Sequence, residues 1–427
     1  MATDVLIIGG GSREHALAWK LKQSPRVGQI YIAPGNGGTS NVAENVAIEV
    51  MDFEHLAMFV EQKQIGLTIA GPDDPIGRGV GDFFRNRGLK IFSPSKAAAQ
   101  IESSKAFAKQ LMRDAGIPTA EFSVFKEYDL ALSHVRARGA PIVVKASGLA
   151  LGKGVYVCQT LAEAEQSLKE IMLDKQFGDS GSEVVIEEFL GGQEISIHAL
   201  CDGKNFVLFP PSQDHKQVEE GDTGPNTGGM GVIAPVPWVT QEMMQEIGET
   251  IVRPTLDVLA KKGAPFVGML YPGLKMTPQG PKVLEFNARF GQPECEAYMR
   301  LLKTDLLDLC EAAIDGKIMI YHNSPIEWNP GFAANIILAS GGYPGAYKKG
   351  LPITGIEEAE KVPGVIVFHT GTAVQGPSLN TAGGRVLGVT AVGEILKEAL
   401  DRAYAAADKI QFEGKYLRHD IGAKALQ

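Results

Sequence analysis

The sequence predicts a multidomain protein of the α/β and α+β class, with a doubly wound parallel sheet at its N-terminus and a separate α/β domain at its C-terminus. At roughly 100–200 residues per domain, 427 residues suggest two to four domains. Short apolar runs alternate with helical patterns over about the first 100 residues, which is typical of parallel sheets. The 50 glycines cluster at short sites without a repeat, which indicates tight turns and phosphate loops.

The first predicted unit is a strand, a glycine loop and a helix, in residues 4–8, 9–11 and 12–23. Ser12 is the expected cap of this helix, and Glu14 lies in its first turn. Helix-like segments separate three further short strands, at 29–33, 67–71 and 89–93. This alternation predicts the doubly wound sheet.

The middle of the chain predicts both helices and strands. A helix is expected over 94–116, strands over 122–126, 141–148, 184–189 and 193–202, and a hairpin over 266–277 and 281–287. Beyond about residue 320, strand-like runs are followed by one helix. We therefore expect 323–427 to form a separate C-terminal α/β domain.

Charge and composition exclude several classes of protein. The net charge of −9 argues against nucleic acid or an anionic membrane as the main partner. No apolar run approaches the ~18–20 residues of a membrane span, and the N-terminus lacks the basic region of a signal peptide. The four cysteines are far apart and form no C-x-x-C pair, which favours reduced thiols in a cytoplasmic protein.

Two glycine loops point to phosphate ligands but match neither common nucleotide motif. The loop at 9–14 opens like a dinucleotide fingerprint, yet Glu14 stands where the last glycine belongs. The loop at 148–154 resembles a P-loop, yet Gly154 replaces the magnesium-binding Ser or Thr. The first suits a phosphate monoester at a helix N-terminus, and the second a mobile loop over a triphosphate. Plain turns without a ligand are the alternatives.

The strand expected at 281–287 carries a candidate metal site. Strict alternation places Val283, Glu285 and Asn287 on one face, and Leu284 and Phe286 on the apolar face. A carboxylate and an amide in this register suit Mg²⁺, whose other ligands are phosphates and waters. Arg289, just beyond, suits the stabilisation of a phosphoryl group in transit. The alternative is a solvated strand face.

A glycine-rich loop at 221–231 follows Asp214, His215 and Lys216. Such a loop offers many backbone N–H groups to a carboxylate or phosphate, and the alternative is a disordered connection. His215 invites interpretation as a general base, but a lone histidine in such a stretch is more often structural.

Ten stretches, in chain order, are similar to signature blocks of one family. They are VLIIGGGSREHALAWKL, YIAPGNGGT, AGPDDP, SKAFAK, PIVVKASGLALGKGV, VVIEEFLGGQE, QDHK, GDTGPNTGGMG, LEFNARFGQPE and GGRVLGV. Over nearly its whole length the chain resembles the phosphoribosylamine–glycine ligase (glycinamide ribonucleotide synthetase) family of the ATP-grasp superfamily. GDTGPNTGGMG and EFNARFG are specific within that superfamily.

The resemblance implies an N-terminal substrate-binding domain at 1–103, an ATP-grasp domain at 104–322 with a lid at about 122–190, and a C-terminal domain at 323–427. It implies that ATP drives the joining of glycine to 5-phosphoribosylamine through glycyl phosphate, in purine biosynthesis. Mg²⁺ or Mn²⁺ is the implied cofactor. Small molecules are the expected partners, without nucleic acid or membrane, and a monomer is the working expectation.

The resemblance also implies residue roles. ATP is expected to contact Lys105, Lys145, Gly152, Lys153, Gly154, Glu187, Glu188, Leu190 and Glu194. Glu285 and Asn287 are expected to hold the cation, and Arg289 to act on the transferring phosphoryl group. The phosphoribosylamine is expected near Gly11, Ser12, Arg13, Gly71, Pro72 and Asp73, and glycine near Asp214, Thr223 and Gly224.

Three positions depart from the family pattern: Ser147 where Asp is frequent, Gln292 where Asp is frequent, and Glu296 in place of Gln. None removes an expected metal or phosphate ligand, although Gln292 leaves the geometry around Arg289 open. The alternatives are another ATP-grasp ligase or carboxylase, a nucleotide-binding regulator without turnover, and a dinucleotide oxidoreductase.

Overall fold

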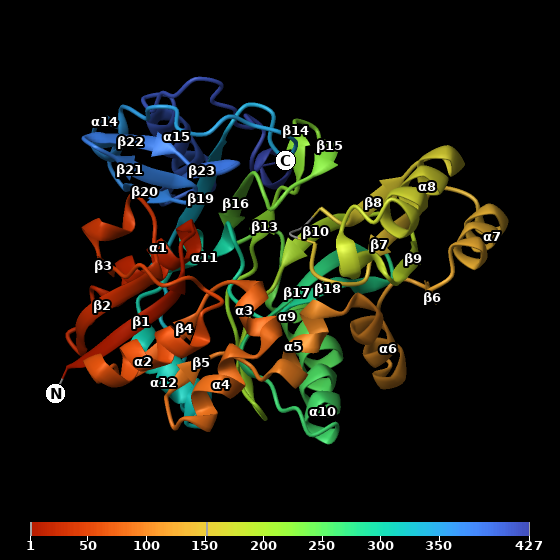
Figure 1. Cartoon of the computed structure of the whole chain (residues 1–427), viewed down its shortest axis with the longest axis horizontal. Helices are drawn as coiled ribbons and strands as arrows, with labels where there is room; N and C mark the ends of the chain where they lie inside the picture. The colour runs from red at the N-terminus through yellow and green to blue at the C-terminus, as the bar shows by residue number, and fades with distance from the viewer. Residues whose placement is uncertain (1, 151–152, 427) are drawn as a thin grey trace.

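The computed structural model describes residues 2–150 and 153–426. Five parallel strands form the N-terminal sheet in the order β3-β2-β1-β4-β5, which confirms the predicted doubly wound sheet (Figure 1). The elements are β1 (Thr3–Gly9), α1 (Ser12–Leu21), β2 (Val27–Pro34), β3 (Glu44–Asn45), α2 (Phe53–Lys63), β4 (Leu67–Ala70), α3 (Asp73–Arg78), α4 (Val80–Asn86) and β5 (Ile91–Phe92). Leu6 and Ile8 pack toward α2 and α4, and Val5 and Ile7 pack toward α1, so β1 is buried on both faces.

The single helix predicted at 94–116 is wrong, because the chain forms two helices there. These are α5 (Lys96–Ser103) and α6 (Lys105–Ala115). Ser104 is extended, with φ −140° and ψ 104°, and its side chain accepts a hydrogen bond from the Phe107 backbone N–H. Serine competes with the helix by capping, so α6 begins anew at Lys105.

The lid is a four-stranded antiparallel sheet that projects to one side of the molecule (Figure 1). Its order is β6-β9-β7-β8, from β6 (Phe122–Phe125), β7 (Ile142–Ala146), β8 (Val155–Cys158) and β9 (Val184–Glu188). Two helices, α7 (Tyr128–Arg138) and α8 (Leu161–Leu168), pack on it and complete a separate small hydrophobic core. The lid therefore has packing of its own.

The central sheet contains the predicted hairpin, now β17 (Val267–Thr277) and β18 (Gly280–Asn287). The strand predicted at 193–202 divides into β10 (Gln193–Ser196) and β11 (Ala199–Asp202), which pair with different parts of β17. The other elements of this region are β12 (Phe206–Leu208), α9 (Gln241–Ile247), α10 (Arg253–Lys261), α11 (Glu294–Leu301), α12 (Leu306–Ile314) and α13 (Ile320–Asn323).

A third, antiparallel sheet has the order β13-β16-β19-β23-β20 and is covered by α15 (Leu396–Ala407). Its strands are β13 (Gln213–Asp214), β16 (Gly231–Ala234), β19 (Phe332–Ala339), β20 (Val365–His369) and β23 (Arg385–Gly393). The remaining elements are α14 (Ile356–Glu360) and two hairpins, β14 (Gln217–Glu219) with β15 (Thr223–Asn226) and β21 (Thr372–Gln375) with β22 (Ser378–Thr381). Two strands that precede residue 323 join this sheet, so the predicted domain boundaries remain a prediction.

Among the helices of residues 2–150 and 153–426, none is long and apolar enough to cross a bilayer.

Candidate active site

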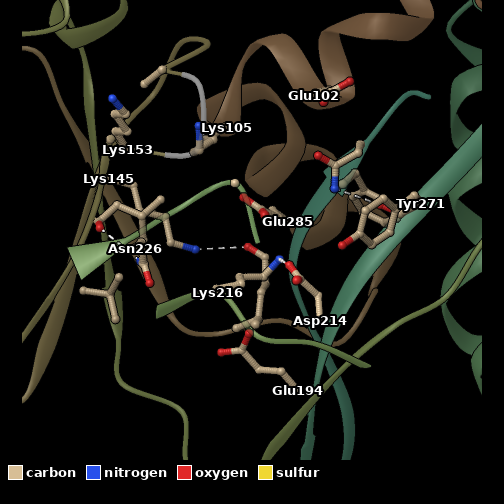
Figure 2. Close-up of a pocket in the computed structure, with 18 of the residues that line it drawn as sticks. Glu102, Lys105, Lys145, Lys153, Glu194, Asp214, Lys216, Asn226, Tyr271 and Glu285 are labelled. Atoms are coloured by element: carbon tan, nitrogen blue, oxygen red, sulfur yellow. Dashed lines mark hydrogen bonds and ion pairs between the residues drawn. The ribbon is translucent and has the colours of Figure 1, made fainter. Parts of the chain in front are cut away.

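One cavity of about 480 Å³ lies among the lid, the central hairpin, α5 and α6 (Figure 2). Figure 2 shows Lys145, Lys153 and Asn226 along one wall, with Tyr271 and Asp214 on the opposite side. The sequence-predicted residues that line the cavity are Arg13, Asp73, Lys105, Lys145, Lys153, Gly154, Glu187, Glu188, Leu190, Glu194, Asp214, Glu285, Asn287 and Arg289. The fold thus collects residues that are up to 276 positions apart, from Arg13 to Arg289.

Six other predicted residues do not line this cavity: Gly11, Ser12, Gly71, Pro72, Thr223 and Gly224. Thr223 and Gly224 lie on the exposed strand β15, where the Thr223 hydroxyl donates to the Glu220 carbonyl over 3.0 Å. Gly152 lies outside the described residues. The expected substrate contacts of these residues remain predictions.

The cap of α1 differs from the prediction. Gly11, not Ser12, precedes the helix, and its backbone N–H donates to Glu14 Oε2 over 2.7 Å. Arg13 Nε pairs with the other Glu14 oxygen at 2.6 Å, and Arg13 Nη1 donates to the Phe290 carbonyl over 3.2 Å. The Glu14 side chain also requires glycine at position 71, because a Cβ at Gly71 would lie 1.9 Å from Glu14 Oε1. Glu14 therefore fixes Arg13 at the edge of the cavity.

Two lysines pair with the buried carboxylate of Glu187, and a third, Lys105, lines the same cavity. Lys145 Nζ lies 2.9 Å and Lys109 Nζ 3.0 Å from Glu187 oxygens, and Lys105 Nζ donates to the Gly148 carbonyl over 3.2 Å. Burial lowers the pKa of Lys109 to about 8 and also lowers the pKa of Lys105. One carboxylate among three ammonium groups leaves this wall with a positive balance, which suits a polyphosphate. Sequence analysis missed Lys109, although it lies four residues after Lys105 on α6.

Two further carboxylates, Glu188 and Glu194, also line the cavity. Glu188 pairs with Lys282 at 3.5 Å and accepts from the Glu121 N–H over 3.0 Å. Glu194 pairs with Lys275 at 3.1 Å. Both remain about one-third exposed and so remain available to a ligand.

The strict alternation predicted for β18 is wrong at Leu284. Glu285 is paired with Gly273, but Val283 is paired with the next residue, Leu274, so Leu284 is an extra residue in a β-bulge. Val283 is therefore in the core at 0% exposed, while Leu284 and Glu285 line the cavity. Phe286 packs in the core at 2% exposed and also borders the cavity. The bulge keeps Glu285 and Asn287 at the cavity although the predicted faces were misassigned.

Glu285 is an uncommitted carboxylate. No hydrogen bond or ion pair within 4.0 Å joins its side chain to another residue among those described. Burial by itself would raise the pKa of Glu285, but Lys216, Lys105 and Lys145 outweigh burial and lower it. Asn287 follows two residues later on β18, and its Oδ1 accepts a hydrogen bond from Arg289 Nη2 over 3.1 Å. An ionised carboxylate and an amide oxygen are ligands that a divalent cation prefers.

Arg289 is held by Glu102, a residue that sequence analysis missed. Glu102 Oε1 lies 3.0 Å from Arg289 Nη2, and both side chains are largely buried. Burial opposes the charge of Arg289, but Glu102 and Asp73 raise its pKa above the usual value. The guanidinium therefore stays charged at the cavity wall.

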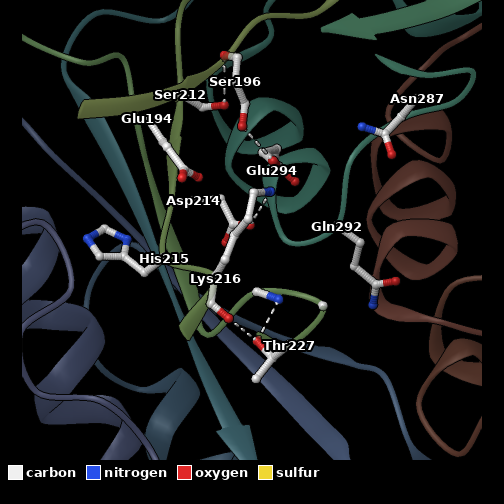
Figure 3. Close-up of polar contacts among 12 residues, drawn as sticks. Glu194, Ser196, Ser212, Asp214, His215, Lys216, Thr227, Asn287, Gln292 and Glu294 are labelled. Carbon is white, nitrogen blue, oxygen red and sulfur yellow. Dashed lines mark hydrogen bonds and ion pairs between the residues drawn. The ribbon is translucent and has the colours of Figure 1, made fainter. Parts of the chain in front are cut away.

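Asp214 and Lys216 form a second ion pair at 3.3 Å, next to Glu294, in which the Asp214 carboxylate is buried and the Lys216 side chain is partly exposed (Figure 3). Burial raises the pKa of Asp214 to about 7. Burial works against the charge of Lys216, yet Tyr271, Asp214 and Glu285 raise its pKa well above the usual value. Lys216 therefore brings a stable positive charge to the face of the cavity opposite the lid. The sequence pattern assigns it no role of its own.

His215 faces away from this pair, toward the C-terminal elements (Figure 3). Its Nε2 accepts from the Gly422 N–H over 3.1 Å, and its Nδ1 lies 3.2 Å from the Gly231 carbonyl. Burial lowers the pKa of His215 to about 4, so the ring is neutral. These contacts support the structural interpretation of this histidine.

The C-terminal part of the chain reaches the cavity through Arg385 and Tyr343. Arg385 Nη1 donates to the Gln292 carbonyl over 3.0 Å, and the Tyr343 hydroxyl accepts from the Gly228 N–H over 3.0 Å. Gln292 also donates from Nε2 to Ser12 Oγ over 2.7 Å. Gln292 thus joins the N-terminal helix α1 to the loop after β18, and its side chain makes no hydrogen bond to Arg289 among the described residues.

Glu296, another departure from the family pattern, is fully buried, and neither carboxyl oxygen has a hydrogen-bond partner among the described residues. Burial raises its pKa from 4.5 to about 7. The folded state therefore binds this proton more tightly than the unfolded state, and the stability present below pH 4.5 is lost as pH rises through about 7.

We predict that Glu296→Gln removes this loss of folding stability at high pH. At 1.36 kcal/mol per pKa unit, the variant gains up to about 3 kcal/mol in free energy of unfolding at pH 8 and little at pH 4.5. Urea unfolding of the wild type and the variant at pH 4.5 and pH 8 measures the difference in free energy of unfolding. Asp214, whose pKa is also raised to about 7, is present in both proteins, so its contribution cancels. An equal change at both pH values would show that Glu296 does not ionise in this range.

The lid, the central sheet and the lysine-rich cavity between them define the chain as an ATP-grasp ligase. Family models described as phosphoribosylglycinamide synthetase match it in three parts: the N domain at 3–102, the ATP-grasp (A) domain at 103–295 and the C domain at 333–424. The chain belongs to the phosphoribosylglycinamide synthetase family.

Relatives match over nearly the full length. The chain is 49% identical to the phosphoribosylamine–glycine ligase of Vibrio parahaemolyticus, covering 99% of this chain and 98% of the relative. It is 46% identical to that of Rhodopirellula baltica with the same coverage. The crystal structure of the Thermotoga maritima phosphoribosylamine–glycine ligase is 34% identical, has a TM-score of 0.83, and is matched over 98% of this chain and 100% of that one. A biotin carboxylase domain from Hydrogenobacter thermophilus, 16% identical with a TM-score of 0.75, shares the fold.

Proposed function

We propose that this enzyme joins glycine to 5-phosphoribosylamine at the expense of ATP, giving glycinamide ribonucleotide, ADP and phosphate. A glycine carboxylate oxygen attacks the γ-phosphorus of ATP, and ADP leaves. The phosphoribosylamine nitrogen then attacks the carbonyl carbon of glycyl phosphate, loses a proton, and phosphate leaves. The observation that carries this proposal is the gathering of Glu285, Asn287 and Arg289 with three lysines in one cavity of a chain matched end to end by such ligases.

The lid wall is suited to the nucleotide. We assign Lys105 and Lys145 to the ATP phosphates, and Lys153 and Gly154, which line the same cavity, extend this assignment. Gly152 is assigned with them on the family resemblance alone. Glu188, Leu190 and Glu194 are proposed to contact the adenosine part. Glu187 is buried between Lys145 and Lys109, so we assign it the role of holding these lysines rather than the expected contact to ATP.

The donor set at β18 fits a divalent cation. Glu285 is ionised and uncommitted, and Asn287 presents an amide oxygen beside it. Among the described residues, no three His, Cys, Asp or Glu side chains form a metal cluster by themselves, so these two ligands fit an ion that also uses phosphate oxygens. When bound, Mg²⁺ or Mn²⁺ would neutralise charge on the terminal phosphates of ATP.

The opposite face is suited to the other two substrates. Arg13 and Asp73 lie at the N-terminal end of the cavity, where we place the phosphoribosylamine, near Gly11, Ser12, Gly71 and Pro72. Asp214 is proposed to approach glycine, whereas the expected contact of Thr223 and Gly224 to glycine rests on the family resemblance alone, because both lie on the exposed strand β15 outside the cavity. Chain groups here orient the substrates, and the lid excludes the water that would hydrolyse glycyl phosphate.

The surroundings support the remaining proposals. All four cysteines are free and buried, which suits the reducing cytoplasm.

An ADP-release assay with single omissions tests the proposed function. We expect ADP release with glycine and 5-phosphoribosylamine both present, and a loss of at least about 100-fold when either is omitted. Release that needs bicarbonate or another amino acid instead would assign a different ATP-grasp reaction. No release with any combination would support a nucleotide-binding regulator.

A further inference from the structure

Glu102 contacts two successive residues of the loop after β18. Its Oε2 accepts from the Ala288 backbone N–H over 2.8 Å, and its Oε1 pairs with Arg289 Nη2 at 3.0 Å. The carboxylate is 7% exposed, and Ala288 is fully buried. Glu102 thus fixes the backbone that carries Arg289 as well as the guanidinium itself.

We propose that Glu102 is a positioning residue for phosphoryl transfer, which holds the guanidinium of Arg289 at the reacting phosphate while other groups bind ATP. This inference rests on the proposed function. Arg289 Nη2 is shared between Glu102 and Asn287 Oδ1, whereas Arg289 Nε is buried without a hydrogen-bond partner among the described residues. Arg289 Nη1 donates to the Phe290 carbonyl over 3.3 Å, so both terminal nitrogens of the guanidinium are held at the cavity wall.

The need for this support is electrostatic. Asp73 and Glu294 line the same cavity as Arg289 and also act on its charge. Without the charge of Glu102, these other carboxylates compete for the guanidinium. A buried charged pair that loses one partner leaves the other uncompensated, so the arginine would shift toward them.

The local fold explains how Glu102 reaches this position. Ser104 ends α5 and caps α6. Glu102 therefore lies in the last turn of α5, and Lys105 is the first residue of α6. Both side chains line the cavity, Glu102 near Arg289 and Lys105 near the lid loop. The helix break thus separates a group that positions the arginine from a group suited to a phosphate.

A double-mutant cycle tests the proposal. We expect Glu102→Gln to lower kcat by about 10- to 100-fold, because a shift of about 1 Å in a catalytic group costs up to about 100-fold. The Kd for ATP should stay within about twofold. In an Arg289→Ala background, Glu102→Gln should change kcat by less than about twofold, because a residue that acts through Arg289 has nothing left to position.

Two further variants separate positioning from folding. Asp202 is a buried carboxylate outside the cavity that accepts from the Asn205 N–H over 2.7 Å, so Asp202→Asn should lower Tm and leave kcat of the folded protein unchanged. If Glu102→Gln does not fold, Glu102→Asp, which keeps the charge, takes its place in the cycle.

Each outcome decides the matter. Independent, multiplying effects of the two substitutions, an unchanged kcat, or an equal loss of ATP affinity would each overturn the positioning role. Failure of the wild-type enzyme to release ADP with glycine and phosphoribosylamine would instead reject the proposed function. In that case a crystal structure of the Glu102→Gln protein still tests the inference, since an unmoved Arg289 guanidinium contradicts it.

Discussion

Arg289→Ala is expected to lower kcat by about 1,000-fold while the Kd for ATP changes by less than about threefold. A guanidinium in a desolvated site stabilises charge that develops on the transferring phosphoryl group, and such contributions reach about 10³-fold or more. We propose that ATP is held by other groups, Lys105 and Lys145, which lie on the lid side of the cavity. The effect should therefore fall on the transition state.

Steady-state ADP release and calorimetric ATP binding measure the two quantities separately. Arg289→Lys is the matched control, because it keeps the charge but loses the planar fork that contacts both Glu102 and Asn287. It should recover only a small part of kcat. A loss of ATP affinity with normal turnover of bound substrate would show that Arg289 binds ATP and has no special role in the reaction.

Local patterns were sufficient to predict the N-terminal fold. Residues 4–8 are apolar without interruption and are followed by glycines and a helical pattern, and they form β1, the loop and α1 as expected. The local pattern does not indicate the helix break at Ser104. Alanines on both sides favour a helix, and serine also occurs inside helices. Tertiary packing of α5 and α6 decides that Ser104 caps.

The bulge in β18 shows a different limit. Period-two alternation assigns faces only while each residue has one partner across the ladder. The extra residue at Leu284 depends on the register with β17, which is set by contacts outside the strand. The predicted pair of Glu285 and Asn287 is nevertheless at the cavity, because the bulge precedes both residues.

The missed residues come from elements far apart in sequence. Glu102, Lys216 and Arg385 lie on α5, after β13 and on β23, and nothing in their local sequence indicates that they meet. Lys216 and Arg385 stood in stretches that resemble family blocks, which was the available signal. The carboxylate of Glu14 is the converse case, because a departure from the dinucleotide motif turned out to be the cap that fixes Arg13.

Glu285→Gln is the second substitution with a large expected effect, a loss of about 1,000-fold in kcat/KM for ATP. The change preserves shape but removes a cavity carboxylate that no hydrogen bond or ion pair commits within the described residues. Charge neutralisation on the nucleotide is a main source of rate in phosphoryl transfer, so a weakened cation site should cost several kcal/mol of barrier.

The same substitution should change the cation dependence and the stability. Calorimetric titration of the enzyme–ATP complex with Mn²⁺ should show weaker binding in the variant, whereas Glu188→Gln, a cavity carboxylate away from Asn287, should weaken ATP binding and keep the cation dependence. The pKa of Glu285 is lowered in the folded state, so its stabilising effect is present above about pH 4.5 and is lost as pH falls. Glu285→Gln should therefore unfold more easily at pH 7, where Lys105, Lys145 and Lys216 lose the carboxylate they share. An unaltered cation dependence in this variant would remove Glu285 from the metal site and leave it a role only in neutralising those lysines.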